Sequence, residues 1–405
     1  MDASSMRGEA MTAARIEGER RAPPGARRVL HVVRQMHAGG IAVWLMNILR
    51  HIDRDRYRMD FLLVHDGPAA YANEIRGLGS SITSCLGYHN PWKFAGNFAN
   101  VLKDAGPYDV VHSHLYNYSG FVLKLAARHE VPVRIAQSHT DTRLKEANQG
   151  RWRQLYRRAY LDLTRHWLRR YATAGLAVSR GAADALFGAD WATDARFRVL
   201  PLGLDFKPFS APCDQGEVRT SLGLPADALV IGHVGNYVWH KNHDFLLEIA
   251  RKILAKEPRA RLLLVGHGLT GSPVEKQVQS LGLADRVLIA GPRDDVPRLM
   301  VGAMDAFLFP SHYEGLGLVL LEAQAAGLPC VLTDSLPREV DLVPQLVHRL
   351  SLKASPATWA SAALHAAQER SVPRQAAFAQ IAASEFAIEN AVRQLTRVYD
   401  QGGAA

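Results

Sequence analysis

The chain has 405 residues, of which 48% are hydrophobic and 21% are charged. This length and composition are typical of a globular protein with two domains, each large enough to bury its own core. The chain lacks a long apolar run, and its three cysteines are scattered, so neither a transmembrane helix nor a disulfide framework is expected. Residues 1–27 have no apolar periodicity and no signal-peptide pattern, which predicts a disordered leader and favours a cytoplasmic protein.

The excess positive charge lies in the first half of the chain. Residues 1–205 contain 29 Lys and Arg against 19 Asp and Glu, whereas the remaining residues contain 19 against 20. Residues 151–172 contribute seven arginines, interleaved with aromatic residues and leucines at helical spacing. Such a helix suits an anionic membrane surface, although its apolar stripe can equally pack on its own domain. Nucleic acid is not expected, because no binding motif accompanies the charge.

The first half of the chain alternates short apolar runs with longer polar or amphipathic segments. This alternation predicts a doubly wound α/β domain with a parallel sheet over residues 28–203. The expected strands are 29–33, 61–64, 110–112, 133–136 and 174–179, and the first expected helix is 41–49.

A turn-rich link at 201–205 precedes a second run of the same pattern, which predicts a second domain over 204–383 and a terminal helix within 384–405. The expected strands are 230–234, 261–265, 286–289, 306–309 and 330–333. Residues 245–254 have helical periodicity, with Asn242 as the expected N-cap. Ligands of open parallel sheets bind beyond the carboxyl ends of the strands, so a binding cleft is expected between the two domains.

Two acidic residues eight apart, Glu314 and Glu322, bracket the start of a predicted helix. Gly315 and Gly317, on either side of Leu316, leave the backbone bare where free N–H groups and the helix dipole attract phosphate. Glu322 would then accept hydrogen bonds from the ribose of a nucleotide, and Glu314 from the hydroxyls of a linked sugar. The pattern therefore predicts a site for a nucleotide-linked sugar.

Further candidates follow other predicted strands. Lys241 lies in the loop after strand 230–234, where an ammonium would neutralise the diphosphate of a donor as the leaving group gains charge. The pair Gly39 and Gly40 follows the first strand, where it would let the backbone close over that diphosphate. His114 and His139 follow strands 110–112 and 133–136 and are expected to project into the cleft.

Two other motifs do not predict cofactor or metal sites. Residues 266–271 match G-x-G-x-x-G, but Ser272 and Pro273 follow and no carboxylate stands about twenty residues later, so a tight turn is expected rather than a dinucleotide site. Asp53 and Asp55 match an Asp-x-Asp metal pattern, but they follow a helix in a charged loop. No metal and no cofactor are therefore predicted.

Residues 309–311 followed by 314–322 resemble the E-x7-E motif of the retaining glycosyltransferases of family 4, which have the GT-B fold. Residues 36–41 resemble the glycine loop of the family, 112–114 with Gly120 its His-x-His segment, and 235–243 its phosphate-binding loop. The resemblance runs from about residue 28 to 399. It implies two Rossmann-like domains facing a central cleft, with the terminal helix packed back on the first domain.

The resemblance also implies roles for individual residues. His114 would reach the donor sugar, and His139 with Thr140 would face the acceptor. The family usually has an arginine where this chain has Asn236, so either Lys241 acts alone with the helix end or another cation such as Arg293 compensates.

The expected function is transfer of a sugar, with retained anomeric configuration, to a saccharide or lipid-linked acceptor in polysaccharide or glycolipid synthesis. The family mostly uses UDP-sugars, so a UDP-sugar is the expected donor, and peripheral contact with the inner face of the membrane is expected. The alternatives are a nucleotide-sugar epimerase or sugar phosphorylase on the same fold, and a non-catalytic partner in a polysaccharide-assembly complex. A phosphorylase would need a lysine-bound pyridoxal phosphate, for which the sequence has no clear signal.

Overall fold

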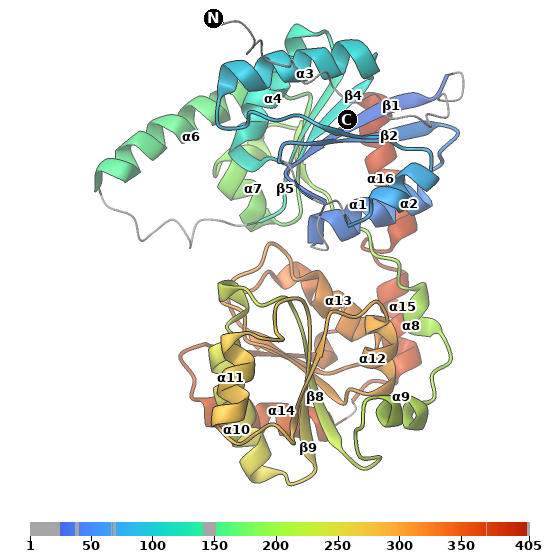
Figure 1. Cartoon of the computed structure of the whole chain (residues 1–405), viewed down its shortest axis with the longest axis vertical. Coiled ribbons are helices and arrows are strands. Elements are labelled where there is room, and N and C mark those ends of the chain that lie inside the picture. Colours follow the sequence, from blue (N-terminus) through green and yellow to red (C-terminus); the bar gives the residue numbers. More distant parts are fainter. Residues whose placement is uncertain are drawn as a thin grey trace, which may run out of the picture.

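The computed structural model describes residues 25–36, 40–65, 67, 70–140, 151–369 and 371–402, without the side chains of residues 151–158. The chain forms two α/β domains, each built on a parallel sheet with helices on both faces (Figure 1). The predicted fold class is therefore confirmed.

The N-terminal domain has a seven-stranded sheet in the order β3-β2-β1-β4-β5-β6-β7, and every neighbouring pair is parallel. Its strands are β1 (Arg27–Val33), β2 (Tyr57–Leu63), β3 (Ile82–Ser84), β4 (Val110–Ser113), β5 (Val133–Ser138), β6 (Ala174–Ala177) and β7 (Phe197–Val199). Its helices are α1 (Gly40–His51), α2 (Ala72–Gly77), α3 (Pro91–Ala105), α4 (Ser119–Arg128), α6 (Arg151–Tyr171) and α7 (Arg180–Phe187).

The C-terminal domain has a six-stranded parallel sheet in the order β10-β9-β8-β11-β12-β13. Its strands are β8 (Leu229–Val234), β9 (Ala260–Val265), β10 (Val287–Gly291), β11 (Ala306–Phe309), β12 (Cys330–Thr333) and β13 (Val347–Leu350). Its helices are α8 (Lys207–Ser210), α9 (Gln215–Ser221), α10 (His243–Lys256), α11 (Pro273–Ser280), α12 (Val296–Gly302), α13 (Leu318–Ala325), α14 (Pro356–Gln368) and α15 (Arg374–Ala382).

Three strands were absent from the sequence prediction: β3, β7 and β13. Each has only three or four residues, mixes polar with apolar side chains, and lies at an edge of its sheet. An edge strand pairs on one side only, so it needs no continuous apolar run. All the predicted strands except β10 pair on both sides within a sheet, where apolar runs are required. The edge strand β10 was found because its sequence is itself apolar.

The last helix, α16 (Ile388–Gln401), returns to the N-terminal domain and lies beside α1. Its buried residues recur at helical spacing: Ile388, Ala391, Leu395, Val398 and Tyr399. The return is fixed at the interdomain link, where the Leu204 amide donates to the Phe386 carbonyl at 2.9 Å and the Ile388 amide donates to the Leu204 carbonyl at 3.0 Å.

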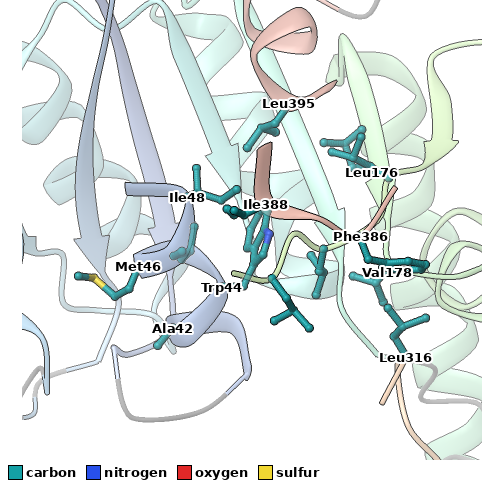
Figure 2. Packing of buried hydrophobic residues seen from close by; sticks show 14 of the residues in the cluster. Ala42, Trp44, Met46, Ile48, Leu176, Val178, Leu316, Phe386, Ile388 and Leu395 are labelled. Carbon is teal, nitrogen blue, oxygen red and sulfur yellow. The ribbon is translucent and has the colours of Figure 1, made fainter. Parts of the chain in front are cut away.

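The buried core continues from one domain into the other. Figure 2 shows Trp44 of α1 close to Ile388 at the start of α16, and Leu316 of the C-terminal domain close to Val178 and Phe386. A second, separate cluster fills the space between the C-terminal sheet and helices α10 and α14. The shared cluster means that the loop before α13 is packed against the N-terminal domain.

The predicted cap of α10 is wrong in its mechanism. Asn242 occupies the N-cap position, but its backbone is left-handed (φ 57°) and its side chain makes no capping bond. The amide Nδ2 instead donates to the carbonyl of Pro310 at 3.1 Å. Asn242 therefore ties the loop after β8 to the end of β11, a contact between segments far apart in sequence that helix periodicity does not reveal.

Candidate functional site

Helix α13 begins at a glycine with a left-handed backbone. Gly317 has φ 88° and ψ 53°, a conformation that costs other residues energy. No side chain caps the helix there, so the N–H groups of its first turn are not occupied by a capping side chain and can meet an anion. This local geometry agrees with the phosphate-binding role expected for the Gly315–Gly317 segment.

Lys241 and Glu314 form an ion pair at this helix entrance. The Lys241 ammonium lies 2.8 Å from Oε1 of Glu314, and the two side chains are only 13% and 12% exposed. The same ammonium lies 4.4 Å from the centre of the Phe309 ring. The loops that carry the pair leave β8 and β11 and are joined by a hydrogen bond from the His312 amide to the His240 carbonyl. Two neighbouring strands thus bring the pair together at the carboxyl edge of the sheet.

Glu322 lies one turn into α13 beside this ion pair. Burial raises the pKa of Glu322 to about 7, and the nearby Lys241 ammonium offsets part of that rise. A carboxyl group with a pKa near neutrality is poised to exchange its proton for hydrogen bonds from a ligand. Lys241 therefore interacts with both carboxyl groups predicted from sequence, through an ion pair with Glu314 and through its electric field at Glu322.

The loop between Glu314 and α13 touches the N-terminal domain directly. The Ser179 hydroxyl donates to the carbonyl of Gly315 at 2.8 Å. A Cβ atom on Gly315 would lie 2.0 Å from the carbonyl oxygen of His139 and 3.1 Å from Cα of Thr140. Glycine is therefore required for this close approach, and it places the two predicted acceptor residues beside the predicted donor loop.

His114, which is buried, and His139, which is half-buried, belong to a group of histidines on the N-terminal side of this contact. Nδ1 of His114 lies 2.9 Å from Nε2 of His139, and Nε2 of His114 lies 3.0 Å from Nδ1 of His31. Burial lowers the pKa of His139 and of His31 to about 3. Burial, together with the neighbouring histidines, also lowers the pKa of His112 and His114 well below the ordinary value. The group is therefore neutral at physiological pH.

His31, His112 and His114 are also close enough to be considered as metal ligands. One ring nitrogen of each lies within 4.8 Å of the others, and this is the one such group found among the residues that the structure describes. Both nitrogens of His114 are, however, already within hydrogen-bond distance of other imidazoles. Hydrogen bonding therefore accounts for the arrangement without an ion.

Asn236 and Arg293 have local roles in the structure. Oδ1 of Asn236 accepts a hydrogen bond from the His267 amide at 3.1 Å, which joins the loops after β8 and β9. Arg293 makes a two-point ion pair with Asp295, at 2.7 and 2.8 Å. The charge of Arg293 is thus already matched, so Lys241 is the cation that the described residues place beside Glu314 and Glu322.

The glycine pair after the first strand is described only in part. Gly40 begins helix α1, whereas Gly39 lies outside the described residues. The sequence reasoning also missed His31, Ser179 and Tyr399. His31 carried a usable signal, because it interrupts the apolar run of β1 at a position that is fully buried; the contacts of the other two depend on tertiary packing.

Two family models together match most of the chain. The model described as "Glycosyl transferases group 1" matches residues 214–380, and the "Glycosyl transferase 4-like domain" matches residues 39–203. EpsF of Bacillus subtilis (strain 168), which is named as a glycosyltransferase, is 35% identical over 378 residues, which are 92% of this chain and 96% of EpsF.

More distant relatives are also named as glycosyltransferases, and solved structures have the same fold. The UDP-Gal:alpha-D-GlcNAc-diphosphoundecaprenol alpha-1,3-galactosyltransferase of Escherichia coli is 27% identical over 236 residues, which are 56% of this chain and 58% of that protein. Among solved structures, Anabaena HepE in complex with UDP and glucose superposes with a TM-score of 0.74 at 20% identity, covering 93% of this chain and 100% of that one. A HepE complex with UDP-glucose gives 0.73 at 21% identity, covering 92% and 99%. These superpositions support the fold.

Proposed function

Because the chain belongs to the group 1 glycosyltransferases, we propose that it transfers a sugar from a UDP-sugar to a saccharide or lipid-linked acceptor with retention of anomeric configuration. The setting we propose is the synthesis of an exopolysaccharide or glycolipid at the inner face of a membrane. The name of EpsF, the lipid-linked acceptor in the name of the Escherichia coli relative, and the UDP-glucose bound to HepE support this proposal.

The observation that carries the proposal is the cluster of Lys241, Glu314 and Glu322 at the entrance of α13. The helix N-terminus and the Lys241 ammonium supply positive potential for a diphosphate. Glu322, one turn into the helix, is a carboxylate that accepts hydrogen bonds from the two ribose hydroxyls. Glu314 pairs with Lys241 at 2.8 Å, so it shares that ammonium with the bound diphosphate and turns its other oxygen to the hydroxyls of the sugar.

The proposed chemistry needs no covalent intermediate. The acceptor hydroxyl attacks the anomeric carbon on the face from which UDP departs, the bond from that carbon to the diphosphate oxygen breaks, and the acceptor proton passes to the departing diphosphate. Lys241 stabilises the negative charge that develops on the leaving group. Neutral His139 lies on the opposite side of the interdomain contact, where its unpartnered Nδ1 binds a substrate hydroxyl. Neutral His114 faces other imidazoles with both ring nitrogens and holds the His139 ring in place.

Peripheral membrane contact is supported by the described part of α6. Tyr160 and Leu163 are 39% and 46% exposed, and Arg170 is exposed on the same helix. Figure 1 shows α6 extending away from the body of the N-terminal domain. Exposed apolar groups beside arginine are suited to an anionic lipid surface. None of the described helices combines the length and hydrophobicity needed to cross a bilayer.

The test is release of UDP from a panel of UDP-sugars by the purified protein, with and without anionic lipid vesicles and lipid-linked saccharide. We expect turnover with one or a few donors, stimulation by the vesicles, and a product that keeps the anomeric configuration of the donor. An altered UDP-sugar formed without acceptor would identify an epimerase. Binding of UDP with no turnover of any donor would favour a non-catalytic partner.

A further inference from the structure

The buried histidines continue beyond His114 to the last helix of the chain. Nε2 of His31 lies 3.3 Å from the hydroxyl of Tyr399, and the same hydroxyl lies 3.3 Å from Nδ1 of His112. With the 3.0 Å and 2.9 Å contacts of His114, a continuous series of hydrogen bonds runs from Tyr399 on α16 to His139 at the interdomain contact. We call this series the histidine chain; its members are Tyr399, His31, His114 and His139.

Each member of the histidine chain can donate one hydrogen bond. A neutral imidazole carries one N–H and one acceptor nitrogen. Burial raises the pKa of the Tyr399 hydroxyl well above its ordinary value, so it keeps its one proton. If one ring reverses its tautomer, its neighbour must also reverse, because two facing donors or two facing acceptors cannot form a hydrogen bond. The directions of the hydrogen bonds between the four groups are therefore coupled, and all of them reverse together.

Tyr399 has two possible orientations with opposite results. When its hydroxyl donates to His31, each ring donates onward and His139 is left with hydrogen on Nδ1. When it donates to His112 instead, every bond in the chain reverses and Nδ1 of His139 becomes an acceptor. The orientation of the Tyr399 hydroxyl therefore determines whether Nδ1 of His139 donates or accepts a hydrogen bond.

The far end lies where a substrate is expected. Nδ1 of His139 is buried and has no hydrogen-bond partner among the described residues. The His139 backbone touches Gly315, next to Glu314, and the ring lies 5.6 Å from that of Trp44. A buried polar atom without a partner is costly. A substrate hydroxyl, which can donate or accept, would satisfy it.

We propose that Tyr399 is a positioning residue that acts through His31 and His114 to fix the tautomer of His139, and so decides whether the N-terminal domain offers a donor or an acceptor to a hydroxyl of the bound sugars. This inference rests on the proposed glycosyltransferase reaction. The inference gives α16 a role in substrate recognition, although this helix is not part of the loop that is proposed to bind the donor.

The direct test observes the tautomers. Full-length protein is labelled with ¹⁵N at histidine, and the ring nitrogen shifts distinguish protonated from unprotonated nitrogens; His31→Gln and His139→Gln variants assign the signals. We expect one tautomer at His139 in the unsubstituted protein and a mixture in Tyr399→Phe, which removes a single oxygen atom. Circular dichroism and the melting temperature check that the variant is folded.

The matched control is Tyr57→Phe. The Tyr57 hydroxyl donates to Asp400 at 2.8 Å, so this variant also loses a hydrogen bond to α16 but leaves the histidine chain intact. For UDP release from UDP-glucose, we expect kcat/KM to fall about tenfold in Tyr399→Phe, the scale of one lost neutral hydrogen bond, and to stay within about twofold in Tyr57→Phe.

Three outcomes would overturn the inference. Identical histidine tautomers in Tyr399→Phe and the unsubstituted protein would show that the hydroxyl does not set them. Equal losses of activity in the two variants would mean that both act only by loosening α16. Stoichiometric zinc, measured by elemental analysis, would make the histidines metal ligands. The tautomer measurement needs no turnover, so failure of the proposed reaction would be recognised separately.

Discussion

The two sides of the interdomain contact offer opposite chemistry. On the C-terminal side, Lys241, Glu314 and Glu322 form a charged cluster at a helix entrance. On the N-terminal side, His114 is buried and His139 is half-buried, and both are neutral because desolvation lowers their pKa values. The charged side is suited to a diphosphate, whereas the neutral side is suited to hydroxyl groups.

The difference separates two physical tasks. A diphosphate brings charge that must be matched, and the match matters most when the leaving group departs. A sugar hydroxyl is neutral, so it is better recognised by groups that donate or accept without carrying a charge. We expect substitutions on the charged side to alter UDP binding and the rate of departure, and changes at the contact itself to affect both substrates.

Lys241→Met is expected to have the largest effect. It removes the cation beside the departing diphosphate, and we expect kcat for UDP release to fall about 300-fold, the scale seen when one charge-stabilising group is removed. Steady-state kinetics with UDP-glucose would measure this, with the exposed Lys252→Met on α10 as control. Since Lys241→Met also leaves Glu314 without its ion-pair partner, the double variant with Glu314→Gln should be at least as slow as the single one. Recovery of the rate would contradict the role of the cation.

Glu322→Ala should weaken UDP binding about 100-fold, because two charge-assisted hydrogen bonds from the ribose disappear. Isothermal titration calorimetry with UDP measures the dissociation constant directly. Glu248→Ala, an exposed glutamate on α10, is the matched control. Unchanged affinity in Glu322→Ala would place the nucleotide elsewhere.

Gly315→Ala tests whether the two sides must meet. The added Cβ would lie 2.0 Å from the His139 carbonyl oxygen, so the domains must move apart, and we expect kcat/KM to fall about tenfold through misalignment of the substrates. Small-angle scattering should show a larger radius of gyration. Gly96→Ala, which meets no atom within 4 Å, controls for the substitution; a Gly315→Ala protein with normal size and activity would show that close contact is dispensable.

The last expected effect concerns stability and leaves the activity aside. The folded protein holds the pKa of Glu322 at about 7, above the ordinary value of 4.5. Between these values the folded state binds more protons than the unfolded state, so the free energy of unfolding falls as pH rises through this window. Glu322→Gln removes that loss. Between pH 5 and pH 8, the free energy of unfolding of the variant should therefore rise by about 2 kcal/mol relative to that of the unsubstituted protein.

Thermal unfolding of both proteins at the two pH values measures this gain, and an equal difference at both would refute it. The histidines act in the opposite direction. Their pKa values are lowered, to about 3 for His31 and His139, so the unfolded state takes up protons first and stability is lost as pH falls below about 6.5. The two sides of the contact should therefore destabilise the protein at opposite ends of the pH range.

The sequence predicted the features that depend on local pattern. Apolar runs located the central strands, and the glycines around Leu316 marked the entrance of α13, because both signals lie within a few consecutive residues. Asn242 was misread because its side chain bonds Pro310, which is distant in the sequence. The edge strand β13 was missed because its short, mixed sequence contains no apolar run. Tyr399 was missed, like the role of Asn242, because its contact is distant: it meets His31 across 368 positions.

The return of α16 has a consequence for how the protein is made. The N-terminal domain is synthesised first, yet Leu395 and Tyr399, which complete its interior, follow the whole C-terminal domain in the sequence. During translation, the apolar surface of the N-terminal domain that α16 covers therefore stays exposed while the C-terminal domain is synthesised. The order of synthesis and the order of completion are reversed, so the nascent chain depends on its last turns to seal the part that emerged first.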